Sequence, residues 1–331
     1  MTPGESGAVR ALRRLYVASG LQSALPHGLK TALRRRLWLP LARSTGYPIS
    51  SPRFPRPPLA RNRPPMRLGR VLMACDLNQD YLDYWPSTRR AWLDIVGVEP
   101  LLVLVAEDRD IPDHLRSDEL VVPFTPIEGV HTALQAQCIR LLYPAAVETT
   151  DAVLVSDIDL YPLRPSYFSE TVELLDARHF VSYRDVYVNR SMVSMLFNAA
   201  TPPTWCDVFG VSTLEDVRAK LTTWTSELEY DGRRAWPGWY TDQKLLYRTL
   251  TEWPEAPDRW WVLDDDYTRH HQLDRLELEN EEGLTPRRRD AILAQRYSEY
   301  ACLFPYAEHR QVNDLVLELA LAAARSRRRH G

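Results

Sequence analysis

The sequence predicts an α/β fold in which a mostly parallel central sheet is flanked by helices and preceded by a basic N-terminal extension. Short runs rich in Val and Leu alternate with segments of helical period, which is the order of βαβ units. Two of these runs are followed by carboxylates, at Asp76 and at Asp157. The chain has 331 residues, 45% hydrophobic and 26% charged, which is typical of a soluble globular protein with a sizeable core.

The elements are expected in the following order. Short apolar runs predict strands at 71–75, 101–105, 119–123, 152–155, 180–183, 192–197 and 259–263. Amphipathic periodicity predicts helices at about 80–96, 132–142, 213–230, 241–250, 286–296 and 310–325. Pro86 should start or kink the first helix, and Thr241 is the expected N-cap of the helix that it opens.

The first 65 residues form a basic, Pro-rich arm and linker. Residues 1–70 hold 14 Lys and Arg and one acidic residue, for a net charge of +13, whereas the remainder holds 27 basic and 43 acidic residues, for a net charge of −16. The arm is either an interfacial segment that attracts anionic lipid or acidic partners, or a disordered extension. The main domain is expected over 66–310, with a C-terminal helix and basic tail over 311–331.

The four cysteines are far apart and show no CxxC spacing, which favours a reducing compartment. No stretch approaches the ~20 apolar residues of a membrane-spanning helix. We therefore expect a cytoplasmic protein, with peripheral membrane contact through the basic arm as an open alternative.

The segment Asp157-Ile-Asp159 carries the clearest chemical signal. It follows the apolar run 152–155, which is typical of a buried strand. Side chains alternate along a strand, so both carboxylates are expected on the same side, at the edge where open α/β sheets bind ligands. Hard oxygen ligands of this kind suit Mg²⁺ or Mn²⁺, with phosphate oxygens in the remaining positions. The pattern indicates a metal-assisted site for a nucleotide diphosphate.

With these pieces in place, residues 70–310 resemble a glycosyltransferase of the GT-A fold, the metal-dependent nucleotide-sugar type. The matching pieces, in chain order, are the strand at 71–76, the segment 135–140, Asp157-Ile-Asp159, the strand end at 197–200 and Thr241-Asp242-Gln243. The resemblance implies transfer of a sugar from a nucleotide-diphosphate sugar, with a UDP-sugar favoured, to a carbohydrate, lipid-linked or protein acceptor.

The resemblance also implies roles for individual residues. Asp157 and Asp159 would hold the cation, which would stabilise the leaving nucleotide diphosphate. Asp76, Asn78 and Tyr81 would lie near the base and ribose. Arg140 would pair with a phosphate or a carboxylate, and Asn198 would hydrogen-bond the donor sugar. Asp242 would contact the acceptor hydroxyl, as a general base or only to position it. The acceptor side would include Trp236, Trp239 and Tyr240.

The chain departs from the family pattern at the third metal ligand. Many such enzymes supply a C-terminal His, and the segment 297–306 has none. His309 is the first candidate to replace it, with His270 and His271 as alternatives.

Two other functional classes stay open. A nucleotidyltransferase also uses a divalent ion at a strand edge, but it would carry a Gly-rich loop after the first strand, and residues 76–81 contain no glycine. A non-catalytic protein could associate with a membrane or nucleic acid through the basic arm, and its binding would then depend strongly on salt and survive the loss of Asp157 and Asp159. The acidic body makes nucleic acid the less favoured partner.

Overall fold

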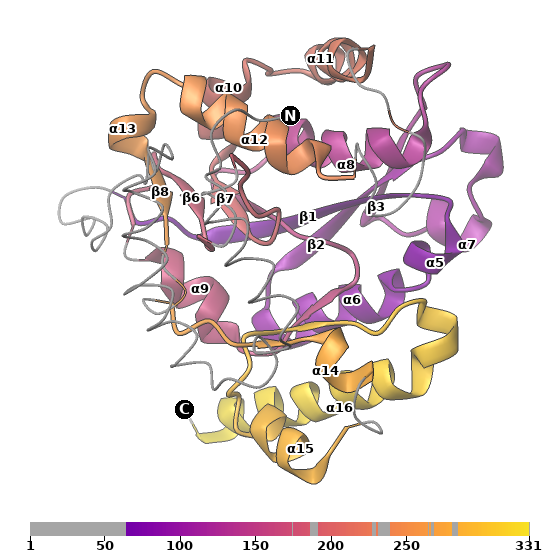
Figure 1. The fold of residues 1–331 in the computed structure, drawn as a ribbon, viewed down its shortest axis with the longest axis vertical. Coiled ribbons are helices and arrows are strands. Elements are labelled where there is room, and N and C mark those ends of the chain that lie inside the picture. The colour runs from indigo at the N-terminus through magenta and orange to yellow at the C-terminus, as the bar shows by residue number, and fades with distance from the viewer. Residues whose placement is uncertain are drawn as a thin grey trace, which may run out of the picture.

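A mixed sheet lies at the centre of the computed structural model, with helices on both faces (Figure 1). The structure describes residues 64–173, 175–185, 191–226, 230, 239–263, 265, 268–279 and 284–330. The predicted arm at 1–65 therefore lies almost wholly outside the described residues, as does Trp236.

The described part of the central sheet has seven strands in the order β3-β2-β1-β4-β7-β6-β8. Their bounds are β1 Leu68–Asp76, β2 Glu99–Val105, β3 Val121–Phe124, β4 Ala152–Val155, β6 Phe180–Ser182, β7 Asn198–Ala200 and β8 Trp260–Val262. All neighbours pair in parallel except at β7, which runs opposite to both β4 and β6. The predicted fold class, a mostly parallel central sheet flanked by helices, is confirmed.

The helices form two layers (Figure 1). One layer holds α8 Thr132–Leu142, α10 Pro202–Phe209, α11 Leu214–Ser226, α12 Thr241–Glu252 and α13 Ala256–Arg259. The other holds α6 Trp85–Ala91, the π-helical turn η2 Trp92–Val96, α7 Asp113–Arg116, α9 Pro165–Glu173, α14 Arg275–Glu279, α15 Pro286–Leu293 and α16 Tyr306–His330. Shorter helical segments are α5 Gln79–Leu82, η3 Asp108–Asp110 and η4 Tyr143–Ala146.

The alternation of side chains along each strand divides the core between these layers. In β1, Val71 and Met73 join the cluster that contains α6 and α16, whereas Leu72 joins the cluster that contains α8 and α12. In β4, Leu154 and Val155 divide in the same way. Because both faces of the sheet are covered, the inner parts of these strands are apolar on both sides.

A second, three-stranded sheet was not predicted. Its strands are β5 Leu160–Pro162, β9 Gln272–Leu273 and β10 Glu299–Ala301, in the order β5-β10-β9. Strands of two or three residues are too short to give a periodic signal in the sequence. The sheet matters for the site, because β5 directly follows Asp159 and β9 comes just before α14.

Two local predictions were wrong. The strand expected at 192–197 begins only at Asn198, because Phe197 has a left-handed backbone with φ of +66° and cannot continue an extended strand. The N-cap of α12 is Tyr240 rather than Thr241, and it makes no side-chain capping bond. Within the described residues, no helix is both long and apolar enough to cross a membrane.

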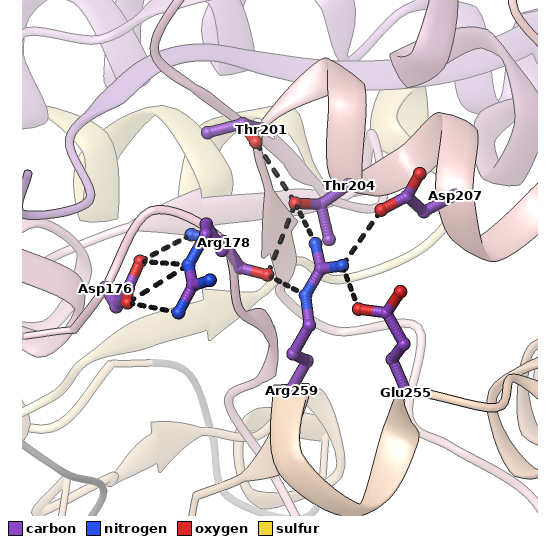
Figure 2. A network of polar contacts seen from close by, with 7 residues as sticks. All are labelled: Asp176, Arg178, Thr201, Thr204, Asp207, Glu255 and Arg259. Atoms are coloured by element: carbon purple, nitrogen blue, oxygen red, sulfur yellow. Dashed lines mark hydrogen bonds and ion pairs between the residues drawn. The ribbon is translucent and has the colours of Figure 1, made fainter. Parts of the chain in front are cut away.

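Figure 2 shows a polar network around Arg259. It lies at the starts of β6 and β8, which form the edge of the sheet opposite to the carboxyl ends of β1 and β4. The Arg259 side chain is 17% exposed. Its guanidinium donates to the backbone carbonyl of Arg178 at 2.8 Å and to the Asp207 carboxylate at 2.9 Å. It also donates to the Glu255 carboxylate. It also reaches Thr204 Oγ1 at 3.3 Å. These bonds tie the start of β8 to α10 and to the segment that enters β6.

We expect Arg259→Met to lower the free energy of unfolding by about 1–3 kcal/mol, because several charge-assisted bonds are lost at once. Chemical denaturation measures this change. Arg90→Met, which removes an exposed ion pair to Glu318, is the matched control and should change it by less than about 1 kcal/mol. Equal effects of the two substitutions would contradict the role assigned to this network.

Candidate functional site

Polar side chains from three strands or strand ends lie at one edge of the central sheet. Asp76 ends β1, Asp157 follows β4 by two residues, and Asn198 begins β7. Because β7 runs opposite to β4 and pairs Asn198 with Val155, its first residue lies beside the carboxyl end of β4. This is the edge at which open α/β sheets bind ligands.

Arg140 is the centre of the site. It lies in the last turn of α8, and its side chain is only 12% exposed. One terminal nitrogen of its guanidinium, Nη1, donates to Asp157 Oδ1, and the other, Nη2, donates to Asp242 Oδ2 on α12. Burial alone would lower the pKa of Arg140, but the two carboxylates outweigh burial and raise it, so the guanidinium stays charged. Both of these partners are carboxylates of the protein, and the predicted contact of Arg140 with the donor stays a prediction.

Asp242 is almost fully enclosed, with 2% of its surface exposed. Burial raises the pKa of this carboxyl, and the adjacent Arg140 opposes the rise. Besides Arg140, it accepts a bond from the backbone N–H of Gln243 at 2.7 Å. Both carboxylate oxygens of Asp242 thus already accept hydrogen bonds from the protein. Its predicted contact with the acceptor hydroxyl, as a general base or only to position it, stays a prediction.

Asp159 has a different partner and a different neighbourhood. Its Oδ2 accepts a bond from Arg275 Nη2 at 2.8 Å, and its side chain is 12% exposed. Arg275 lies on α14, on the opposite face of the sheet from α8 (Figure 1). The expectation that Asp157 and Asp159 project to the same side is therefore wrong. Strand β4 ends at Val155 and a turn follows, so the two-residue alternation of a strand does not continue through the motif.

The residues predicted to face base and ribose lie at the end of β1 and just after it. Asp76 Oδ2 accepts a bond from Thr132 Oγ1 at 2.8 Å, which joins β1 to the start of α8. Asn78 is exposed and caps α5 by accepting a bond from the backbone N–H of Asp80. Tyr81 packs against Phe304, with ring centroids 5.0 Å apart. Asp76 and Asn78 thus stay near the site edge, while Tyr81 is partly used in packing.

Asn198 is fully buried at the start of β7. Its side-chain amide donates to the carbonyl of Ser194 at 2.8 Å, and its Oδ1 is buried without a hydrogen-bond partner in the described structure. The preceding Phe197 holds a left-handed conformation that costs a non-glycine residue about 1–3 kcal/mol. Unsatisfied polar atoms and strained backbone of this kind concentrate at functional sites.

No three His, Cys, Asp or Glu side chains in the described parts of the chain form a group that could hold a metal. His309, the predicted third ligand, lies at a kink in the first turn of α16 and does not join Asp157 and Asp159 in such a group. His270 is also engaged elsewhere, since its Nε2 lies 3.0 Å from Glu299 Oε1 in a buried cluster with Arg184 and Asp265.

The carboxylates of Asp157 and Asp159 each keep one oxygen that a cation could contact. Each carboxylate gives one oxygen to an arginine, and the other oxygen, Asp157 Oδ2 or Asp159 Oδ1, makes no hydrogen bond with the described residues. Carboxylate oxygens are the ligands that Mg²⁺ and Mn²⁺ prefer, and phosphate oxygens and water commonly complete their shells.

Sequence reasoning missed Arg275 altogether. It lies in the segment 274–279, where two leucines among charged residues are too few to show a helical period and no motif marks Arg275 as a partner of Asp159. The two residues meet across 116 positions of sequence through the small second sheet. Thr132 was predicted only as the start of a helix, and its bond to Asp76 adds a contact to the site edge.

We expect Arg140→Met to lower the free energy of unfolding by about 3–5 kcal/mol at pH 7, because Asp242 would be left buried and charged without a partner. The pKa of Asp242 would then rise further above its ordinary value of 3.8, so the native state would hold a proton that the unfolded chain releases. Stability of the variant should therefore fall as pH rises above about 4, and the loss should be smaller at pH 5 than at pH 7.

Urea unfolding at both pH values measures this loss. A second substitution, Asp242→Asn, should restore part of the stability, since it removes the unpaired charge. An equal loss at both pH values, or no recovery in the double variant, would contradict the assignment.

No family model matches the chain, and no curated protein matches it. Solved glycosyltransferase structures do, at low identity. GlyE of Streptococcus pneumoniae TIGR4 is 15% identical with a TM-score of 0.42; the match covers 77% of this chain, which spans only 60% of GlyE. The galactosyltransferase LgtC, solved with donor and acceptor sugar analogues, is 12% identical with a TM-score of 0.39, over 76% of this chain and 95% of that one. Mouse xyloside xylosyltransferase 1 is 11% identical with a TM-score of 0.38, and the match covers 70% of this chain and 97% of that one. All these scores lie below 0.5, so the proposal that follows is based on the residues of the site.

Proposed function

We propose that this protein is a glycosyltransferase that moves a glycosyl unit from a nucleotide-diphosphate sugar to an acceptor hydroxyl. The observation that carries the proposal is the meeting of Asp76, Asp157 and Asn198 at one sheet edge, with Asp157 fixed there by the buried Arg140. Carboxylate and amide oxygens at this edge can accept hydrogen bonds from ligand hydroxyl groups. Together with the nearby arginines, they suit a ligand that carries a diphosphate and its cation.

Each part of the donor has a matching group. Asp157 and Asp159 would hold Mn²⁺ or Mg²⁺, which when bound supplies positive charge to the departing nucleotide diphosphate. Asp76 and Asn78 would accept hydrogen bonds from the ribose and base, with a UDP-sugar as the favoured donor. The free Oδ1 of Asn198 would accept a bond from a hydroxyl of the donor sugar.

Asp242 has a revised role in this proposal. We infer that it acts as a positioning residue, because its burial and its bond to Arg140 hold the guanidinium in place while the guanidinium holds Asp157. The described aromatic residues Trp239 and Tyr240 come just before α12 and would form part of the acceptor side, where a partly exposed ring can stack on a sugar. The acceptor would be a carbohydrate, a lipid-linked sugar or a protein.

Thermal-shift measurements with UDP, GDP, CDP and TDP, each with and without Mn²⁺, test the proposal. At a ligand concentration of 100 times Kd, a specific site should stabilise the protein by about 2.7 kcal/mol. One nucleotide should give a Mn²⁺-dependent shift, and the Asp157→Asn/Asp159→Asn variant should lose it.

Asp108→Asn/Asp110→Asn is the matched control, because η3 carries the same Asp-x-Asp spacing with side chains that are 81% and 54% exposed. This variant should keep the wild-type shift. The proposal would fall if no nucleotide gave a shift, or if the shift survived in the Asp157/Asp159 variant.

A further inference from the structure

The carboxylate of Asp76 is held from two sides at the end of β1. Its Oδ1 accepts a bond from the backbone N–H of Asn78 at 3.1 Å, and its Oδ2 accepts a bond from Thr132 Oγ1 at 2.8 Å. The carboxylate therefore lies between Asn78 and the start of α8. Each of its oxygens has a second lone pair, so Asp76 can accept a further hydrogen bond from a ligand.

The side-chain amide of Asn78 has a fixed orientation. Its Oδ1 accepts a bond from the backbone N–H of Asp80 at 3.1 Å, and a backbone N–H can only donate. The other end of the amide, Nδ2, therefore keeps its two N–H groups for a ligand, while the second lone pair of Oδ1 can still accept a bond. Asn78 is exposed, so a ligand can reach this amide.

The same argument fixes the ring of His131, which sequence reasoning did not select. His131 is the exposed N-cap of α8, and its Nδ1 accepts a bond from the backbone N–H of Ala133 at 3.2 Å. A nitrogen that accepts a hydrogen bond carries no proton, so the proton of the neutral ring is on Nε2. The ring also meets that of Tyr230 nearly at right angles, with centroids 5.3 Å apart. His131 thus offers an N–H donor one residue from the hydroxyl that holds Asp76.

These three side chains form a donor–acceptor–donor pattern, with Asp76 between Asn78 and His131. The imide edge of uracil or thymine has the complementary pattern, because a keto oxygen lies on each side of the N3–H. Cytosine has no hydrogen on N3 and carries an amino group in place of one keto oxygen, and guanine also carries an amino group in place of one keto oxygen.

Resting on the proposed function, we propose that Asp76, Asn78 and His131 recognise the imide edge of a uracil or thymine base in the donor nucleotide. Asp76 accepts the N3–H, while Asn78 Nδ2 and His131 Nε2 donate to the keto oxygens on either side. A cytosine in this place would turn the lone pair of N3 toward the carboxylate, and a guanine would turn its amino group toward a donor. These contacts select the base and do not involve a cation.

Titration calorimetry with UDP, TDP, CDP and GDP in the presence of Mn²⁺ measures this selectivity. Any effect of the cation on the diphosphate is common to all four nucleotides, so the ratios of their Kd values report on the base. UDP and TDP should bind about tenfold or more tightly than CDP and GDP. The 5′-diphosphate of 3-methyluridine, which has a methyl group in place of the N3–H, should bind about tenfold or more weakly than UDP.

A substitution at His131 tests the new residue directly. His131→Ser removes the Nε2 donor but keeps a side chain that is favoured at an N-cap, so the variant should fold. It should lower the preference for UDP over CDP about threefold to tenfold, which is the effect of one neutral hydrogen bond. His114→Ser is the matched control, because His114 is an exposed histidine on α7, outside the site, and should leave the preference unchanged.

The outcomes separate this inference from the proposed function. If a nucleotide binds but uracil and thymine are not preferred, or the methyl group has no effect, or His131→Ser keeps the full preference, then these residues do not recognise the base, and the proposed function stands. If the wild type binds none of UDP, TDP, CDP and GDP, both proposals fall.

Discussion

The site depends on one buried interaction, the Arg140 guanidinium held between Asp157 and Asp242. Arg140 is the necessary member of this bridge, because its removal would leave the buried carboxylate of Asp242 without a charged partner in a low-dielectric interior. The bridge also joins the residue after β4 to α8 and α12, so the direction in which Asp157 faces is set by the packing of two helices on the sheet. A polar loop end is thereby tied to the buried core by side-chain bonds.

The topology of the sheet explains why these groups meet. Strand β7 reverses direction, so its first residue, Asn198, lies at the same edge as the carboxyl ends of β1 and β4. The left-handed Phe197 allows the chain to enter β7 at this point, and its ring packs against Phe168 and Trp92 in the core. Packing thus compensates for local backbone strain, and the strained residue precedes a buried amide at the carboxyl end of β4.

Much of this arrangement follows from sequence patterns that are local. The buried strand at 152–155 and the helix at 132–142 were located to the residue, since each has a clear apolar period and clear ends. The failures are equally instructive. The side on which Asp159 faces depends on a turn that interrupts strand alternation, and Arg275 reaches Asp159 only through a second sheet whose strands are two or three residues long. Contacts that depend on tertiary placement leave no periodic signal.

The most direct test of the central claim is a crystal structure of the protein with a nucleotide diphosphate and Mn²⁺, in which anomalous scattering locates the metal. The account predicts an anomalous peak bound by Asp157 and Asp159, with Arg140 still bridging Asp157 and Asp242 and the nucleotide lying along the ends of β1 and β4. A nucleotide bound elsewhere on the molecule, or an Arg140 that has left Asp242 to contact the phosphates, would contradict it.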